Sequence, residues 1–377
     1  MSDNHDLQAF SARLEEEILN LGTRYNDANL SWTEPVFNQL ALDLFGLQFS
    51  SNPAYHRFCK PRAAQPGGVV DWKRIPAIPT EAFKELTLTS IPETERTKVF
   101  HSSGTTGQKP SRHFHSPASL TLYGASLWAW FVRHLCGSGN VRPGWLLVLS
   151  PRREEAPRSS LVHMFEYIAS RLNPTKTLFA CRAAMDGGWE IEGRKTLGFL
   201  ESAATSGQPG LVLTTAFGLV QLSDLLSAET RRFQLPKGSG VMETGGYKGR
   251  SRALAKAELH QIITHSLGIP ITNVVSEYGM SELSSQAYDH SAGNPLREGA
   301  RVFHFPHWAR ARVVSPETGA EVADGESGLI QVFDLANVFS VLAVQTGDLG
   351  VRRGNGFELI GRAEHLEPRG CSLMAIT

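Results

Sequence analysis

The chain has 377 residues, of which 41% are hydrophobic, and its 37 Lys and Arg residues balance 37 Asp and Glu residues, so its formal net charge is zero. This length is enough to bury a large core and exceeds what one small domain needs. The balanced charge provides no bulk attraction to nucleic acid or to an anionic membrane, and no apolar run reaches the length of a membrane span. We expect no nucleic-acid partner and no membrane span.

The cysteines and the N-terminus indicate the cellular compartment. Cys59, Cys136, Cys181 and Cys371 are scattered and form no CxxC pair, which argues against a structural zinc site and a disulfide framework. The first residues are acidic and lack the apolar stretch of a signal peptide. The prediction is a cytoplasmic enzyme.

Residues 1–98 are predicted to form a helical, then proline-rich, region that packs on the core. Helical spacing of apolar residues covers Leu7–Leu21, and a second helix is expected over Glu34–Phe45. The segment Pro53–Pro79 is expected to be an extended connector, because each proline removes a backbone donor and disfavours helix before it.

Residues 99–295 are predicted to form an α/β core, since buried strands alternate with helices. The expected strands are Trp145–Leu149, Thr177–Ala180, Leu211–Thr214, Val241–Glu243 and Asn273–Ser276. The expected helices are Pro117–Leu135, Ser159–Leu172, Phe217–Leu226 and Ser251–Leu267. Ser116 is a candidate N-cap for the first of these helices, and Gly268 is a stop signal for the last. The pattern predicts a parallel sheet.

In residues 296–360 the sequence pattern changes to short alternating stretches separated by Gly and Pro. These residues are predicted to form a small β-subdomain of antiparallel hairpins. Its expected strands are Ala311–Val314, Leu329–Phe333, Val341–Val344 and Phe357–Ile360. Residues 361–377 are then left as a hinge motif and a short C-terminal tail. The fold class is therefore α/β, with layered sheets and a small β-subdomain.

The strongest chemical signal is a loop rich in glycine and hydroxyl groups that ends at Lys109 and Pro110. Its residues are Ser102, Ser103, Gly104, Thr105, Thr106, Gly107 and Gln108. The glycines permit a tight turn close to a phosphate chain, the hydroxyls donate to phosphate oxygens, and Lys109 adds a positive charge. It is not a Walker loop, because the GKS/T ending is missing. By composition alone, an ordinary Ser/Thr/Gly loop is the alternative.

This loop resembles the phosphate loop of the acyl-adenylate-forming superfamily, which includes acyl-CoA synthetases, luciferases and adenylation domains. Further motifs follow in that superfamily's order: Glu243-Thr244-Gly245-Gly246, Ser276-Glu277-Tyr278-Gly279-Met280-Ser281-Glu282, Gly325–Leu329, Thr346-Gly347-Asp348, Gly361–Glu364 and Arg369-Gly370. Two residues depart from the pattern: Ser281 replaces threonine and Glu364 replaces aspartate. The resemblance implies a fold and a site of adenylate-forming type, with ATP as a substrate.

The resemblance also implies roles for these residues. Gly245, Gly246 and Tyr278 would hold the adenine, and Gly279 and Ser281 would also belong to the nucleotide site. Glu282 would bind Mg²⁺, and Asp348 and Arg362 would hold the ribose. An adenylating site brings a carboxylate and a triphosphate together, so Mg²⁺ must offset their repulsion, and its preferred ligands are oxygens. The alternatives are a solvated Glu282, a core Tyr278, a turn aspartate at Asp348 and a surface arginine at Arg362.

Most superfamily members continue into a mobile lid that carries a lysine assisting adenylation. The sequence stops at Thr377, so we expect this lid to be truncated and its lysine to be missing. Lys109, Lys248 and Arg362 are candidates to supply the positive charge, and the sequence does not choose among them.

Cys371 follows the hinge motif in the string Pro368-Arg369-Gly370-Cys371. In relatives that make thioesters the hinge loop swings into the active site, so a cysteine one residue beyond it is placed to attack an acyl-adenylate. The thiolate is the reactive form, and Arg369 favours it. A bystander cysteine in a frayed tail is the alternative.

This layout resembles the acyl-protein synthetase (LuxE) family over nearly the whole chain, with Gln108, Ser111-Arg112 and Cys371 as matching residues. The resemblance implies that ATP and a carboxylic acid, expected to be fatty, give acyl-AMP and pyrophosphate. Acyl transfer to Cys371 and then to a reductase or another acyl-transfer partner would follow. One alternative is transfer to coenzyme A or a carrier protein, as in phenylacetate-CoA-type ligases. Another is a non-catalytic scaffold subunit of a reductase complex.

Two other groups of residues leave alternatives open. Histidines flanking the phosphate loop are candidates for metal binding, although their spacing matches no common zinc motif: His101, His113 and His115. An apolar helical patch is either core or a wall of the acyl pocket: Trp128, Trp130 and Phe131.

Overall fold

A computed structural model describes residues 2–22, 32–102, 109–137, 142–184, 188–245, 255–296 and 301–363. The chain divides into two compact units. Unit 1 contains Met1–Trp130, Met280–Ala287 and Val302–Thr377, and unit 2 contains Phe131–Gly279 and Tyr288–Arg301. Within the described ranges, no helix combines the length and the apolar character that a bilayer crossing requires.

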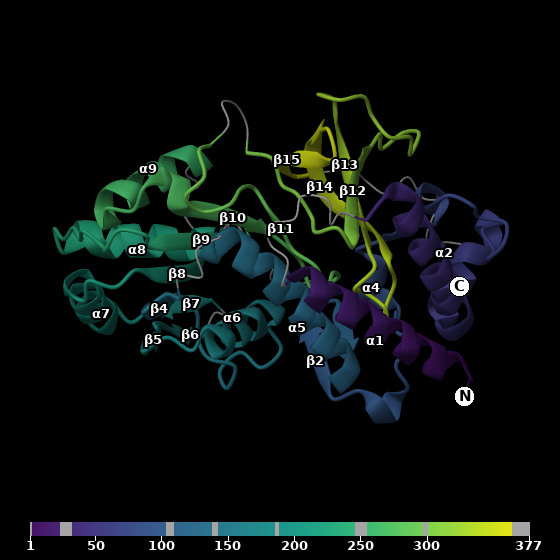
Figure 1. The fold of residues 1–377 in the computed structure, drawn as a ribbon, viewed down its shortest axis with the longest axis horizontal. Helices are drawn as coiled ribbons and strands as arrows, with labels where there is room; N and C mark the ends of the chain where they lie inside the picture. The colour runs from purple at the N-terminus through teal and green to yellow at the C-terminus, as the bar shows by residue number, and fades with distance from the viewer. Residues whose placement is uncertain are drawn as a thin grey trace. The chain divides into compact units, whose positions relative to one another are not determined.

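Unit 1 combines helices from the N-terminal part of the chain with a sheet from the C-terminal part (Figure 1). Its helices are α1 (Ser2–Gly22), α2 (Glu34–Ser51), α3 (Pro53–Cys59), α4 (Ala82–Glu85) and α5 (Pro117–Phe131). Short 3₁₀ turns occupy Lys60–Arg62, Trp72–Arg74 and Glu93–Glu95. Its strands are β1 (Ile78–Pro79), β2 (Lys98–His101), β3 (Arg112–His115), β12 (Ala309–Val314), β13 (Ser327–Asp334), β14 (Ala343–Arg353) and β15 (Gly356–Arg362).

The larger sheet of unit 1 has the order β1-β14-β13-β12, with β15 also paired to β14. Strands β12 to β15 pair antiparallel, as the short alternating runs predict, whereas β1 joins β14 in parallel. Strands β2 and β3 form a separate antiparallel pair on either side of the glycine-rich loop, with His101 opposite Arg112. The loop residues 103–108 themselves lie outside the described ranges.

Unit 2 is built on a sheet with the order β11-β10-β9-β8-β4-β5. Its strands are β4 (Trp145–Val148), β5 (Lys176–Phe179), β8 (Gly210–Thr215), β9 (Gly240–Thr244), β10 (Val274–Tyr278) and β11 (Ala287–Tyr288). Strands β5, β4, β8, β9 and β10 are mutually parallel, which confirms the parallel sheet expected from the alternation of strands and helices. A small hairpin pairs β6 (Cys181–Ala183) with β7 (Trp189–Ile191).

The helices of unit 2 are α6 (Ser160–Leu172), α7 (Gly193–Thr205), α8 (Ala216–Ala228) and α9 (Lys256–Leu267), with a π-helical turn at Val132–Cys136 and a 3₁₀ turn at Ile271–Asn273. Side chains of α7, α8 and α9 share one buried core with Trp145, Val212 and Val241 of the sheet. Helices α8 and α9 lie side by side along it (Figure 1). The predicted stop at Gly268 is confirmed, since this residue caps α9 with φ +67°.

Some expectations about elements were wrong. The extended connector begins instead with helix α3, because the Asn52 side chain accepts a hydrogen bond from Tyr55 N and Pro53 occupies the first turn. Helix α2 continues past Phe45 to Ser51. Helix α7 and the pairs β2–β3 and β6–β7 were not predicted, whereas the predicted cap at Ser116 is present, since its hydroxyl accepts from Ser119 N. The domain boundaries at residues 98, 295 and 360 stay predictions.

Candidate active site

The base of the glycine-rich loop in unit 1 is closed by two residues that flank it. Ser102 N donates to Ser111 O at 3.3 Å, and Ser111 N donates to the Ser102 hydroxyl at 3.0 Å. These bonds extend the β2–β3 pairing to the first residue on either side of the strands. The two ends of the loop are therefore held together, as a tight turn requires.

Glu282 lies directly against this base, although 171 residues separate it from Ser111 in the sequence. The Ser111 hydroxyl donates to Glu282 Oε1 at 3.2 Å, and His113 Nε2 lies 2.7 Å from the same hydroxyl. Glu282 is only 8% exposed, so the alternative of a solvated surface glutamate is wrong. Unit 1 thus brings together two motifs that the sequence placed far apart.

Charge at this cluster is set by burial. Burial raises the pKa of Glu282. The hydrogen bond from the Ser111 hydroxyl and the positive charge of Arg362 lower it, but burial is the largest effect. Burial also lowers the pKa of His113 to about 3, so this histidine is neutral and its 3.6 Å contact with Glu282 is not an ion pair at pH 7. Among the described residues, no lysine or arginine forms an ion pair with Glu282.

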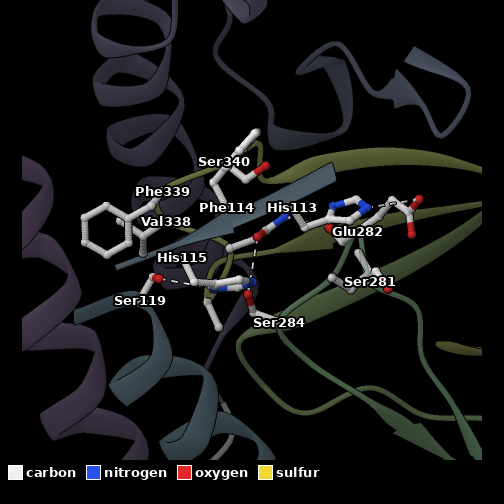
Figure 2. Close-up of a pocket in the computed structure, with 13 residues that line it drawn as sticks. His113, Phe114, His115, Ser119, Ser281, Glu282, Ser284, Val338, Phe339 and Ser340 are labelled. Carbon is white, nitrogen blue, oxygen red and sulfur yellow. Dashed lines mark hydrogen bonds and ion pairs between the residues drawn. The ribbon is translucent and has the colours of Figure 1, made fainter. Parts of the chain in front are cut away.

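A small polar cavity adjoins Glu282, and its volume of about 20 Å³ is little more than a single water needs. Figure 2 shows the His113 ring directed toward the Glu282 carboxylate. The cavity is lined by His113, Phe114, His115, Ser119, Ser281, Glu282, Leu283, Ser284 and residues 336–340. His113 and His115 therefore share one cavity, but in the described part of the chain no three His, Cys, Asp or Glu side chains are placed so that they could hold one metal ion.

The loop between β13 and β14 fixes the main chain around Glu282. Asn337 Nδ2 donates to Glu282 O at 2.9 Å, and the Asp334 carboxylate accepts from the backbone N–H groups of Ser284 and Ser285, each at 2.8 Å. Asp334 is fully buried. Neither Asn337 nor Asp334 stands in a recognisable motif, so the sequence alone did not identify them.

The predicted ribose ligands lie on paired strands of unit 1. Asp348 of β14 is opposite Arg362 of β15, and Arg362 Nε lies 3.5 Å from Asp348 Oδ1. Their side chains differ in exposure, at 14% for Asp348 and 84% for Arg362. Both charges contribute to the pKa of Glu282. Lys109 Nζ instead lies 3.2 Å from Glu85 Oε2 at the surface.

The predicted adenine residues occupy the carboxyl ends of two neighbouring strands in unit 2. Thr244 of β9 is opposite Glu277 of β10, so the residues that follow them, Gly245 and Tyr278, lie at the same edge of the sheet. Gly245 has φ +68°, a conformation that glycine adopts without strain. Tyr278 is buried, and Gly279 follows it. Ligands of parallel α/β sheets bind at this edge.

Beneath this edge the two strands carry a buried acidic pair. Burial acts to raise the pKa of Glu243, but Lys256 at 2.7 Å and His260 outweigh it and hold that pKa at about 2. Burial raises the pKa of Glu277 to about 7, with a smaller contribution from the Glu243 charge, although the Thr244 hydroxyl donates to it. The Ser276 hydroxyl donates a hydrogen bond to Glu243 Oε1 at 2.9 Å.

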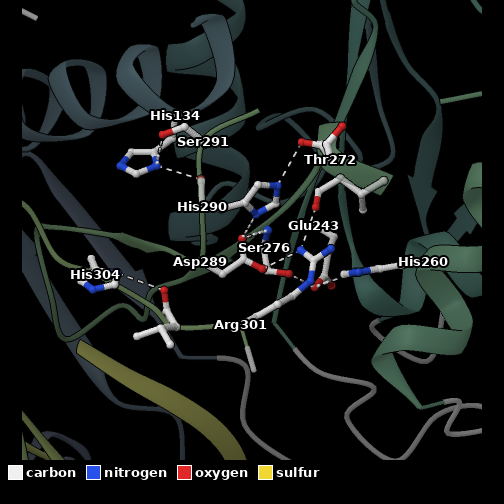
Figure 3. A network of polar contacts seen from close by, with 12 residues as sticks. His134, Glu243, His260, Thr272, Ser276, Asp289, His290, Ser291, Arg301 and His304 are labelled. Atoms are coloured by element: carbon white, nitrogen blue, oxygen red, sulfur yellow. Dashed lines mark hydrogen bonds and ion pairs between the residues drawn. The ribbon is translucent and has the colours of Figure 1, made fainter. Parts of the chain in front are cut away.

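A second part of the same network, shown in Figure 3, surrounds Asp289. Its carboxylate accepts from Ser276 N at 2.9 Å and lies 2.8 Å from His290 Nδ1 and 2.7 Å from Arg301 Nη1. Arg301 also donates to Val274 O. These contacts tie the segment after β11 to strand β10, which carries Tyr278, and this gives Asp289 a structural role.

Several predicted site residues lie outside the described ranges: Ser103, Gly104, Thr105, Thr106, Gly107, Gly246 and Cys371. Ser281 is described and lines the cavity beside Glu282. Of the loop itself, only the flanking residues Ser102 and Lys109 are seen.

Comparisons with known proteins agree with the resemblance in the sequence. The family described as acyl-protein synthetase, LuxE, matches residues 3–376. A long-chain-fatty-acid–luciferin-component ligase of Vibrio harveyi is 22% identical over 95% of this chain and 92% of its own. The protein of the same description from Aliivibrio fischeri is 21% identical over 90% of this chain and 87% of its own.

Solved structures show the fold. A 2-hydroxyisobutyryl-CoA ligase in complex with 2-HIB-AMP and CoA superposes with a TM-score of 0.65 at 13% identity, over 87% of this chain and 69% of the ligase. An ATP-bound RpMatB-BxBclM chimera gives a TM-score of 0.50 at 18% identity, over 72% of this chain. The chain spans about half the length of that chimera, at 49%. The predicted α/β fold of adenylate-forming type is confirmed, and the chain belongs to the acyl-protein synthetase family.

Proposed function

We propose that this protein uses ATP to activate a long-chain fatty acid as an acyl-adenylate and then transfers the acyl group to its own Cys371. The observation that carries the proposal is the hydrogen bond from Ser111, at the base of the glycine-rich loop, to the buried Glu282. It joins the predicted phosphate loop to the predicted metal ligand. The names of the two curated relatives, both long-chain-fatty-acid ligases, support the choice of acid.

The residues present fit Mg²⁺ as the cofactor. Glu282 is a buried carboxylate with no ion-paired lysine or arginine among the described residues, so a cation beside it would stabilise its ionised form. Mg²⁺ commonly takes one or two protein carboxylates together with substrate phosphates and waters, so the Glu282 carboxylate alone could serve as its protein ligand. Bound there, Mg²⁺ would offset the repulsion between the triphosphate and the fatty carboxylate.

The protein's own residues would bind and orient the substrates. The hydroxyls and backbone N–H groups of the loop at 102–107 would hold the phosphates. Tyr278, Gly245, Gly246 and Gly279 would enclose the adenine. The Asp348 carboxylate would accept hydrogen bonds from the ribose hydroxyls, and Arg362 would donate to ribose oxygens. The fatty carboxylate would attack the α-phosphorus, forming an acyl–phosphate bond as pyrophosphate leaves.

In the second step the Cys371 thiolate would attack the acyl carbonyl, forming a thioester as AMP leaves. The acyl group would then pass to a partner, which we propose to be a reductase. We also propose that the protein acts in the cytoplasm.

The first half-reaction is tested by ATP–pyrophosphate exchange over a panel of carboxylic acids of graded chain length. We expect exchange with long-chain acids that requires Mg²⁺. Glu282→Gln should lower it by about 100-fold or more, since an electrostatic contact of this kind is worth several kcal/mol. Glu258→Gln, the same change at an exposed position of α9, should leave it unaltered. No exchange with any acid would favour a non-catalytic scaffold instead.

The second half-reaction is tested by incubating the protein with radioactive fatty acid, ATP and Mg²⁺. We expect label that hydroxylamine releases, as a thioester requires, and that Cys371→Ser abolishes while exchange persists. Label that survives in Cys371→Ser would exclude this residue as the acceptor. Label that appears only on added coenzyme A or carrier protein would favour a ligase of the phenylacetate-CoA type.

A further inference from the structure

Each hydrogen bond around Glu282 has a donor and an acceptor. Which group donates shows that residues outside the Glu282 motif orient its carboxylate. The Ser111 hydroxyl has one hydrogen to donate. Its oxygen lies 3.2 Å from Glu282 Oε1 and 2.7 Å from His113 Nε2. A carboxylate that binds a cation is ionised and only accepts hydrogen bonds. The Ser111 hydrogen must then point to Glu282, and His113 Nε2–H must donate to the Ser111 oxygen.

We propose that Ser111 and His113 are positioning residues for the Glu282 carboxylate, which they hold ready to bind the divalent cation that accompanies ATP. The inference rests on the proposed function and names the residues on which its metal site depends. Groups that hydrogen-bond to a metal ligand typically alter metal affinity by about 10–100-fold when removed.

The position of this pair in the fold supports the role. Ser111 is 1% exposed and His113 7% exposed, so water does not compete freely for their bonds. The His113 ring packs against Phe83, with ring centroids 5.2 Å apart, which fixes the plane of its Nε2–H. Ser111 directly precedes strand β3 and His113 lies within it, so the pairing of β3 with β2 fixes the backbone of this segment.

The main chain of Glu282 is held independently of its side chain. Asn337 Nδ2 donates to Glu282 O at 2.9 Å and to Val341 O at 2.7 Å. Removal of the Ser111 hydroxyl should therefore leave the backbone of Glu282 in place and free only its carboxylate. This separation makes the inference testable without loss of the fold.

The test measures Mn²⁺, a paramagnetic substitute for Mg²⁺, binding to the protein in the presence of ATP, from the electron paramagnetic resonance signal of free Mn²⁺. Ser111→Ala should weaken Mn²⁺ binding by about tenfold. Ser340→Ala is the matched control, because Ser340 lines the same cavity but its hydroxyl donates to Leu88 O. Its Mn²⁺ affinity should equal that of the unaltered protein.

A second variant tests the same role in case Ser111→Ala does not fold. His113→Phe keeps a buried ring beside Phe83 and leaves the Ser111 hydroxyl intact, but removes the donor that orients it. It should weaken Mn²⁺ binding severalfold, and thermal unfolding of each variant shows that the protein tested is folded. In pyrophosphate exchange, Ser111→Ala should raise the half-saturating Mg²⁺ concentration by a similar factor, with most of the maximal rate restored at high Mg²⁺.

The outcomes separate this inference from the proposed function. Unchanged Mn²⁺ affinity in folded Ser111→Ala, with weakened affinity in Glu282→Gln, would overturn the positioning role and leave the proposed function standing. Unchanged affinity in Glu282→Gln would overturn the inference at its premise. If the unaltered protein exchanges pyrophosphate with no acid, the proposed function fails, and the Mn²⁺ measurement alone then decides the positioning role.

Discussion

At the scale of single residues, Glu243, Glu277 and Glu282 are all buried, yet their neighbours give them different charge properties. Lys256 and His260 overcome the cost of burying Glu243 and lower its pKa, whereas burial dominates at Glu277 and Glu282 and raises theirs. A buried carboxylate without a cation is costly to ionise. Burial therefore favours the protonated form of Glu277 and of Glu282 as long as no cation lies beside them.

The raised pKa of Glu277 predicts how stability depends on pH. Its folded pKa of about 7 exceeds its unfolded value of 4.5, so the folded state binds the proton more tightly between these values. Stability from this group is then greatest below pH 4.5 and falls as pH rises toward 7. At about 1.4 kcal/mol per pKa unit the loss is on the order of 3 kcal/mol.

Glu277→Gln should remove this dependence, because glutamine does not titrate. In urea unfolding, the variant should gain stability relative to the unaltered protein as pH rises from 5 to 8, while Glu258→Gln should not. Parallel pH curves for the unaltered protein and Glu277→Gln would show that Glu277 is already ionised at pH 5.

At the scale of elements, two glycines of unit 2 show how packing decides the effect of the same substitution. Gly210 begins β8 opposite Trp145 of β4, and a Cβ there would lie 2.0–2.5 Å from the Trp145 ring. Gly198 lies inside helix α7, where a Cβ would meet nothing within 4 Å. Trp145 is almost fully buried and cannot give way.

Gly210→Ala should therefore destabilise the protein by about 3 kcal/mol, through overpacking of the sheet core. Gly198→Ala should stabilise it by about 0.5–1 kcal/mol, because alanine loses less conformational freedom on folding than glycine does. Urea unfolding of the two variants measures both effects. Changes of equal sign would contradict the packing described around Trp145.

At the scale of the whole molecule, unit 1 is assembled from three separate segments of the chain. Gln48 of helix α2 joins the first segment to the last, since its Nε2 donates to the carbonyls of Asn337 and Val338, each at 2.9 Å, and its Oε1 accepts from Leu342 N. These bonds support the same loop from which Asn337 reaches Glu282.

Gln48→Ala should destabilise the protein by about 3 kcal/mol or more, since each buried group left without a partner costs about 1–3 kcal/mol. Gln39→Ala in the same helix is the control. Gln39 is exposed and bonds only to Asp43 among the contacts described, so its loss should cost less than about 0.5 kcal/mol. Thermal and urea unfolding compare the pair. Equal effects would mean that the Gln48 bonds do not stabilise unit 1.

Much of the fold could be predicted from the sequence because its signals are local. Alternating strands and helices predicted the parallel sheet, Gly268 predicted the end of α9, and short alternating runs predicted β12 to β15. Helix α3 could not be separated from a proline-rich connector, because its start depends on the Asn52 side chain accepting from Tyr55 N. Strand β1 pairs with a strand more than 260 residues away, since Ile78 lies opposite Val344, and no local pattern reports such a contact.

The sequence by itself determined the family and the candidate residues, because motifs are local strings whose order is preserved along the chain. Only the tertiary structure decided that Ser111, His113 and Asn337 surround Glu282, and that Glu243 and Glu277 differ in charge. Burial and hydrogen-bond direction arise from contacts between segments far apart in the sequence. These contacts, rather than residue type, set the proton affinity of each carboxylate.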